Sequence, residues 1–272
     1  MYSPHEERGS AVRPGQHELG GPSGEVILAS YLTSAASIVG AFKAILVAVI
    51  LLLRVVAPVA AGPLEDGVAA IERGDYAVAQ RLFRPLADQG VAAAQYNLGL
   101  MYDSGRGVLQ DPTEAARWYR LAADQGVAEA QYNLGVMYGK GQGVPQNDAE
   151  AVKWYRKAAD QGLLSAQFNI GNMYVHGRGG PRNDAEAVKW YRKAADQGHD
   201  GAQFNLGLMY SSGRGVPQDY VNAHMWLNLS AAQGAQDAAR ERDEIARFMT
   251  PAQLAEAQKH AREWKPAAQS AR

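Results

Sequence analysis

The side chains that most often perform catalysis or bind metals are sparse in this chain of 272 residues. It has no cysteine, which excludes disulfides, thiolate zinc sites, iron–sulfur clusters and cysteine nucleophiles. No grouping of Ser, His and Asp with a nucleophile turn is recognisable. The histidines fall at no spacing that places two on one helical turn; they are His5, His17, His176, His199, His224 and His260. The sequence therefore predicts no catalytic residue, no metal ligand and no cofactor.

Paired glycines raise the question of a phosphate-binding loop. They occur in S-G-R-G-V at 104–108 and K-G-Q-G-V at 140–144. The Walker lysine and hydroxyl are missing, and paired glycines are expected where a helix ends and the chain reverses, so we interpret these loops as structural. An arginine recurs in the loop, and it either binds a carboxylate or phosphate of a partner or bonds nearby helix-end carbonyls. These residues are Arg106, Arg178 and Arg214, with Gln142 in the remaining copy.

The elements that carry these loops repeat every 36 residues. The period is marked by Trp118, Trp154, Trp190 and Trp226 and by Gly90, Gly126, Gly162, Gly198 and Gly234. Residues 147–162 recur letter for letter at 183–198, which indicates internal duplication. Each unit is predicted to hold two helices, neither of which could bury its apolar stripe alone. The pattern therefore predicts an all-α fold, a solenoid of 36-residue helix-turn-helix repeats in which each unit packs on its neighbours.

Local signals mark the ends of the two helices. Asp111 is predicted to cap the second helix, with Pro112 in its first turn and Glu114 closing a capping box; Asn147 with Glu150 and Asn183 with Glu186 repeat this arrangement. Gly126 ends that helix. The first helix contains a glycine that costs about 0.5–1 kcal/mol against alanine, so we expect close helix approach at these positions: Gly99, Gly135, Gly171 and Gly207. The repeated tryptophans are interpreted as core anchors.

The motif A-Q-[YF]-N-[LI]-G-x-M-Y-x-x-G-x-G starts at Ala94, Ala130, Ala166 and Ala202. With the A-A-x-Q-G of the second helix, it resembles the Sel-one-like repeat family, a relative of the tetratricopeptide repeats. The resemblance covers roughly Leu64 to Pro266. It implies a right-handed α-α superhelix whose members act mainly as adaptors for other proteins, often in bacterial envelopes or signalling assemblies. Members described as β-lactamases are cysteine-rich, so that activity is not carried over to this chain.

One face of the first helix is the candidate binding surface. On a helical wheel centred at Leu98, Tyr96, Leu100 and Asp103 lie opposite the core side. In the related tetratricopeptide fold this face lines the concave groove, so the resemblance implies a row of rings there, flanked by asparagines. The alternative is that the rings pack between adjacent units. The predicted partner-binding residues are Tyr96, Asn97, Leu100, Tyr132, Asn133, Phe168, Asn169, Phe204 and Asn205.

The amino-terminal segment differs from the repeats. Residues 1–25 have the composition of a disordered segment, and the apolar run 44–53 fits the core of a signal peptide better than a full membrane span. Cleavage is expected between Ala61 and Gly62. The long stretch before the run suggests a true translation start further in, at about Val39. The alternative is an uncleaved inner-membrane anchor at about residues 37–58.

These observations predict four parts: a leader at 1–61, an amino-terminal half repeat at 62–89, four repeats at 90–233 and capping helices with a tail at 234–272. With 27 basic and 28 acidic residues, the chain is not built to bind nucleic acid. We expect a non-enzymatic, periplasmic or secreted bacterial scaffold whose groove binds a protein or peptide. The alternatives are an envelope hydrolase and a purely structural envelope spacer.

Overall fold

The computed structural model describes residues 62–267. This part of the chain holds twelve α-helices and no strand. They are α2 (Pro63–Glu72), α3 (Tyr76–Asp88), α4 (Ala92–Ser104), α5 (Pro112–Asp124), α6 (Ala128–Lys140), α7 (Asp148–Asp160), α8 (Leu164–His176), α9 (Asp184–Asp196), α10 (Asp200–Ser212), α11 (Tyr220–Ala232), α12 (Gln236–Ala246) and α13 (Pro251–Glu263).

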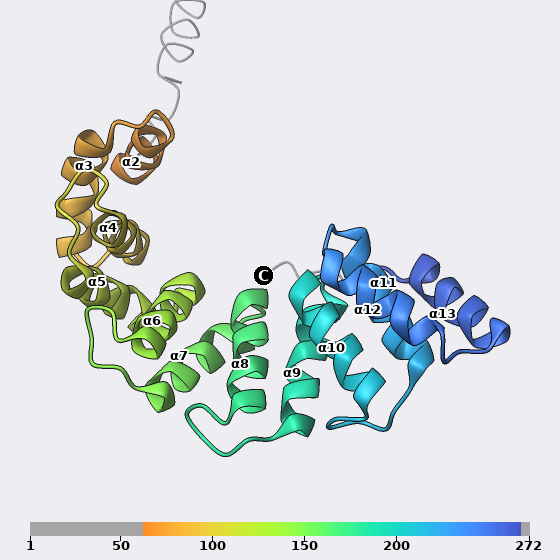
Figure 1. Cartoon of the computed structure of the whole chain (residues 1–272). Helices are drawn as coiled ribbons and strands as arrows, with labels where there is room; N and C mark the ends of the chain where they lie inside the picture. Colours follow the sequence, from red (N-terminus) through yellow and green to blue (C-terminus); the bar gives the residue numbers. More distant parts are fainter. Residues whose placement is uncertain (1–61, 268–272) are drawn as a thin grey trace, which may run out of the picture. The chain divides into compact units, whose positions relative to one another are not determined.

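The helices form hairpins that stack in chain order, which confirms the predicted solenoid (Figure 1). The pairs α4–α5, α6–α7, α8–α9 and α10–α11 are the four 36-residue units, called here units one to four. Residues 62–89, predicted as a half repeat, contain the two helices α2 and α3. The predicted leader lies outside the described residues. Within the described part, no helix has the length and apolar character needed to cross a bilayer.

The repeated tryptophans tie each unit to the one before it. Trp118 is 2% exposed and belongs to the same buried cluster as Phe83 and Leu98, which lie on α3 and α4. Trp154, Trp190 and Trp226 make the equivalent contacts in the next three units. Because each indole fills space between two hairpins, removing it would damage a boundary rather than one unit, as expected of a solenoid.

The helical glycines allow the two helices of a hairpin to touch. A Cβ atom added at Gly135 would lie 2.7 Å from Cδ1 of Tyr155, a distance that carbon atoms do not reach without displacement. Gly99, Gly171 and Gly207 meet the corresponding side chain of their own second helix at 2.5–2.6 Å. The expectation of close helix approach is thus confirmed, and it explains why glycine is present despite its cost in a helix.

The predicted capping boxes form only by half. The side chains of Asp111, Asn147 and Asn183 accept hydrogen bonds from backbone N–H groups of their helices, as predicted. The glutamates do not complete the box, because their carboxylates pair with a basic residue three positions on, as Glu150 does with Lys153. A full capping box occurs instead at Thr250 and Gln253 of α13.

A ladder of buried glutamines links the units, and the sequence analysis did not predict it. Nε2 of Gln131 donates to the carbonyl of Ala123 at 3.0 Å, and its Oε1 accepts from Nε2 of Gln161 at 2.8 Å. Both atoms of the buried amide are therefore satisfied. The same two bonds recur at Gln95, Gln167 and Gln203.

The carboxyl-terminal helices cover the last unit. The ring of Trp264, which follows α13, meets Trp226 edge to face at 6.3 Å between centroids. The N–H of Ala267 donates to the carbonyl of Asp196 at 2.7 Å. These contacts hold the end of α13 against α9 and α11, and so the apolar edge of unit four is covered.

Candidate functional site

The predicted rings are half-buried, so they lie between the two alternatives that the sequence left open. Tyr132 on α6 packs on Tyr155 of α7, with 5.7 Å between ring centroids. Tyr96 with Tyr119 and Phe168 with Tyr191 repeat this pair in units one and three. Each of these rings therefore packs inside its own hairpin on one side and keeps part of its surface open on the other.

Two members of the predicted set behave differently from the rest. Asn97 bonds the carbonyl of Ala93 in its own helix at 2.8 Å. Phe204 packs near the cluster of Leu227 and Ile245 and lines a separate pocket of about 310 Å³ beside the start of α12. Neither residue joins the pocket described below, which contains Tyr132 and Asn169 of the predicted set.

The tyrosines of the second helices have buried rings, yet their hydroxyls reach the same face. The ring of Tyr119 is buried, while its hydroxyl donates to Asp103 at 3.4 Å. The hydroxyl of Tyr191 donates to Oδ1 of Asn172 at 2.7 Å. In both cases an asparagine of the following unit, Asn133 or Asn205, acts on the pKa of the phenol as a hydrogen-bond donor.

Burial keeps these phenols protonated. It raises the pKa of Tyr155 and of Tyr191 to about 12, and it raises the pKa of Tyr119 further still. The neighbouring asparagine opposes this shift in each case, because a donor favours the phenolate. At neutral pH all three hydroxyls are therefore neutral groups with a proton to donate.

Tyr155 differs from its two counterparts in having no acceptor from its own unit. The positions that hold Asp103 in unit one and Asn172 in unit three are Gly139 and Val136 in unit two. Neither side chain can accept a hydrogen bond. Asn169 of unit three acts on the pKa of the Tyr155 hydroxyl as a hydrogen-bond donor, not as an acceptor.

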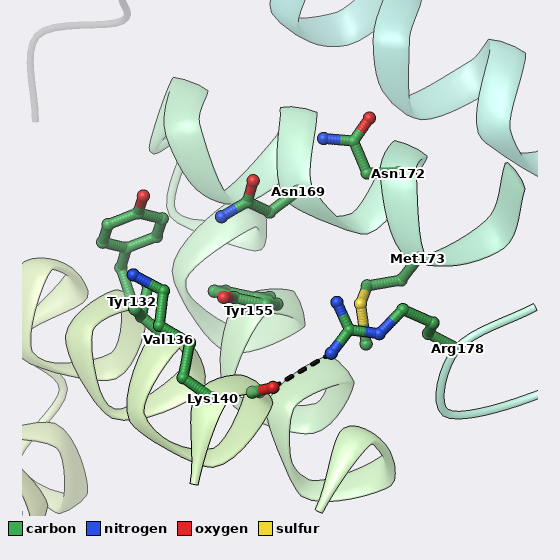
Figure 2. Close-up of a pocket in the computed structure, with 9 residues that line it drawn as sticks. Tyr132, Val136, Lys140, Tyr155, Asn169, Asn172, Met173 and Arg178 are labelled. Atoms are coloured by element: carbon green, nitrogen blue, oxygen red, sulfur yellow. Dashed lines mark hydrogen bonds between the residues drawn. The ribbon is translucent and has the colours of Figure 1, made fainter. Parts of the chain in front are cut away.

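A pocket of about 300 Å³ opens at this point, between α6 and α8. Figure 2 shows the Tyr155 ring between the side chains of α6 and those of α8. The lining residues are Tyr132, Val136, Gly139 and Lys140 of α6, Tyr155 of α7, Asn169, Asn172 and Met173 of α8, and Arg178 of the following loop. Two adjacent units build the pocket together.

Gly139 opens the pocket, and the backbone does not require a glycine there. Its conformation is helical, and the nearest atom to an added Cβ would be the Cβ of Ala151 at 3.8 Å, an ordinary contact. A glycine inside a helix costs about 1 kcal/mol relative to alanine. Gly135, four residues earlier, is needed for close packing, whereas Gly139 leaves space that the equivalent residues Asp103, Val175 and Ser211 occupy with side chains.

Arg178 closes one side of the pocket and is held firmly. Its Nη2 donates to the carbonyl of Gly139 at 2.9 Å and to Oδ1 of Asp148 at 2.7 Å (Figure 2 shows the first of these bonds). The hydrogen bond to Asp148 raises the pKa of the guanidinium. Arg178 thus bonds a carbonyl near a helix end, as one interpretation of the sequence held, and in addition an aspartate of the preceding unit. Among the residues that the structure describes, the side chain of Arg214 bonds only the equivalent aspartate, Asp184.

The glycine loops are structural, as interpreted from the sequence. Gly141 ends α6 with φ of 70°, in the left-handed region that glycine adopts without strain. A Cβ at Gly143 would lie 2.1 Å from the carbonyl oxygen of Pro112 in the preceding unit. The second glycine of each loop therefore permits close contact between units.

The polar groups of the described region do not form a metal site. Across residues 62–267, no group of three or more His, Asp or Glu side chains is placed to hold a metal ion. The pocket instead combines amide, phenol, ammonium and guanidinium groups around an aromatic wall. Such a combination is suited to recognition of a polar or anionic side chain.

Comparison with known proteins identifies the repeat. The Sel1 repeat matches residues 61–91, 92–127, 128–163, 164–199 and 201–234. A Sel1 repeat protein from Oxalobacter formigenes is similar in structure, with 34% identity, a TM-score of 0.65 and coverage of 75% of this chain and 83% of that one. No curated protein matches this chain.

A second similar structure is a protective antigen of uropathogenic Escherichia coli strains that displays an SLR fold. It has 37% identity and a TM-score of 0.63 over 69% of this chain, and the match spans only 41% of the antigen's length. The five matched repeats cover more than half of the 272 residues, and the chain therefore belongs to the Sel1 repeat family.

Proposed function

We propose that this protein is an exported scaffold that binds a segment of another protein along the face formed by its first helices. Sel1 repeats are a scaffold typical of protein–protein interaction and are generally non-catalytic. Along this face Tyr132 and Phe168 supply apolar ring surface, and Asn169 supplies hydrogen bonds. Aromatic anchors flanked by polar groups are the usual source of affinity in such grooves.

The observation that carries the proposal is the pocket between α6 and α8. It lies among the half-buried rings, two units build it, and Gly139 leaves it open although the backbone does not require a glycine there. A purely structural face would gain from a side chain at this position, as units one, three and four have. The pocket therefore supports a binding role for this face.

Removing two rings tests the proposal. The variant Tyr132→Ala/Phe168→Ala should lose capture of the native partner from cell extract by more than about tenfold, because both rings would contact it. The matched control is Tyr138→Ala/Tyr174→Ala, which removes rings from the same two helices on the face that contacts Arg120 and Arg156. Both variants lose ring packing, so melting temperatures must show that each remains folded. Equal capture by the two variants would refute the proposal.

Export is the second part of the proposal. It rests on the apolar run at 44–53 and the small residues before Gly62, which lie outside the described part of the chain. Amino-terminal sequencing of the native protein should find Gly62 first, in the periplasmic or secreted fraction. A mature start within residues 1–38 would refute cleavage at this site. The division of the chain into four parts, which end at residues 61, 89, 233 and 272, is part of the same proposal.

A further inference from the structure

We propose that the pocket between α6 and α8 binds the carboxylate of an aspartate or glutamate side chain in the partner segment. This inference rests on the proposed function and names the chemistry of one contact within it. The evidence is a surplus of hydrogen-bond donors and positive charge in the pocket, which the equivalent places in the neighbouring units do not share.

The donor surplus begins at Tyr155. In units one and three the phenol proton is taken by Asp103 and by Asn172, at 3.4 and 2.7 Å. In unit two the corresponding residues are Gly139 and Val136, so the Tyr155 hydroxyl keeps a proton without an acceptor from its own hairpin. An acceptor brought by a ligand would complete the arrangement that the other two units complete internally.

The net charge of the pocket is positive, which also favours a carboxylate. Lys140 and Arg178 line it, and none of its nine lining residues, all in the described part of the chain, carries a carboxylate. Arg178 is already paired with Asp148. Lys140 is exposed and makes no ion pair within residues 62–267, so its ammonium supplies the net positive charge. Hydrogen bonds from a phenol and a nearby ammonium favour a charged oxygen acceptor over a neutral one.

The neighbouring units would repel or exclude the same group. In unit one the position of Gly139 holds Asp103, whose carboxylate already accepts from Tyr119. In unit three it holds Val175, and Asn172 satisfies Tyr191. The face is therefore not uniform along the solenoid, and unit two is the place where a carboxylate meets free donors. This difference would fix the register of a bound segment.

A side-chain carboxylate fits better than a chain terminus. The pocket lies in the middle of the ring row, with Tyr96 before it in unit one and Phe168 after it in unit three. A segment that contacts rings on both sides must continue past the pocket in both directions. Its terminal carboxylate cannot then lie inside, whereas an aspartate or glutamate side chain can enter from the side.

The test uses the full chain, labelled with ¹⁵N, and blocked peptides with the core sequence Ala-Ala-Glu-Ala-Ala. We expect saturable shifts of the Asn169 and Asn172 side-chain amide signals, with a dissociation constant on the order of 1 mM. The matched peptide with Gln in place of Glu should bind at least about tenfold more weakly. Equal binding of the two, or no shift with the Glu peptide, would overturn the inference. Tighter binding of an all-alanine peptide with a free carboxyl terminus would also overturn it, by favouring a chain terminus.

Variants at Gly139 test the pocket with substitutions that the repeat fold already contains elsewhere. Gly139→Asp and Gly139→Val introduce the residues that units one and three carry at this position, so the hairpin can accept them. Both should weaken binding of the Glu peptide at least about tenfold, the first by repulsion and the second by filling the pocket. Lys140→Ala should weaken it, whereas Lys153→Ala, which removes the same charge beside Glu150, should not. Equal effects of the two lysine variants would contradict a specific site.

The failure of this inference differs from the failure of the proposed function. If Gly139→Asp and Gly139→Val retain full capture of the native partner while Tyr132→Ala/Phe168→Ala loses it, the carboxylate contact is wrong and the binding face stands. If all of these variants retain capture, the face itself is wrong. If Gly139→Asp loses capture together with the Glu peptide, both proposals are supported.

Discussion

Arg214 and Asp184 form an ion pair across the boundary between two repeat units. Nη2 of Arg214 lies 3.0 Å from Oδ1 of Asp184, and Nε donates to Oδ2 at 3.2 Å. The same pair recurs as Arg178 with Asp148, thirty residues apart in each case. In the preceding boundary both partners change together, to Gln142 and Pro112. Two unit boundaries are therefore linked by an ion pair, whereas the boundary between units one and two lacks this pair.

A double-mutant cycle should measure this pair. Arg214→Ala and Asp184→Asn should show a coupling energy of about 0.5–1 kcal/mol in urea unfolding. The bidentate hydrogen bonds strengthen the pair, whereas the partial exposure of the guanidinium to water weakens it. The coupling energy should be smaller in 1 M NaCl, because the electrostatic screening length falls there to about 3 Å. A coupling near zero at low salt would show that the pair adds nothing to the boundary.

The same aspartate should make stability depend on pH. Hydrogen bonds from Arg182 and Arg214 hold the pKa of Asp184 well below its usual range. A carboxyl with a lowered folded pKa stabilises the fold above its unfolded pKa, about 3.9, and this stabilisation is lost as the pH falls below that value. We expect Asp184→Asn to flatten the acid side of the melting-temperature profile. Parallel profiles for the wild type and the variant would contradict this assignment.

Two glycines of α6 should respond in opposite directions to the same substitution. Gly135→Ala should destabilise the protein by about 1–3 kcal/mol, because its Cβ would lie 2.7 Å from Cδ1 of Tyr155. Gly139→Ala should stabilise it by about 0.5–1 kcal/mol, because the helix gains a better former and the nearest contact is 3.8 Å. Each serves as the other's control in thermal unfolding. Destabilisation by Gly139→Ala would mean that the glycine has a structural role.

The glutamine ladder should matter more at its buried end. Gln131→Leu should cost about 1–3 kcal/mol, because the buried carbonyl of Ala123 and the amide of Gln161 each lose one of their two hydrogen bonds and keep only the one to Gly126. Gln161→Ala should cost less, about 0.5–1.5 kcal/mol, because Gln161 itself is exposed and the buried Gln131 loses one hydrogen bond but keeps its bond to Ala123. Chemical denaturation of both variants checks this order. The reverse order would show that the ladder does not hold the boundary.

The sequence was sufficient for the solenoid because the 36-residue period repeats every strong signal four times. Few roles other than core packing suit a tryptophan that recurs at a fixed period, and few other than helix ends or close helix contacts suit a recurring glycine. These residue types therefore predicted the tryptophan anchors, the helix ends and the close approach at Gly135. The glutamine ladder could not be predicted in the same way. A glutamine between apolar residues indicates burial at most. Its partner thirty residues away becomes adjacent only when the hairpin closes, and the carbonyl of the preceding unit reaches it only when two units stack.

The candidate site was predicted in part. The wheel placed the position of Tyr132 opposite the core, and Asn169 was among the predicted binding residues; both line the pocket. The residues equivalent to Gly139 differ between units, but the sequence does not show that Gly139 leaves a void, because the void depends on where α7 and α8 pass. No role was predicted for Tyr155, whose ring is buried. Only the stacked structure shows that its hydroxyl extends beyond the core to the binding face.

The most direct test of the binding face is photo-crosslinking in living cells. A photoreactive phenylalanine at Val136, inside the pocket, should give a covalent adduct with one partner protein, and the adduct should disappear when Gly139→Asp is added. The same group at Lys153, which is exposed on α7 away from the pocket, should give none. Adducts that form equally at both positions, or only at Lys153, would contradict the account.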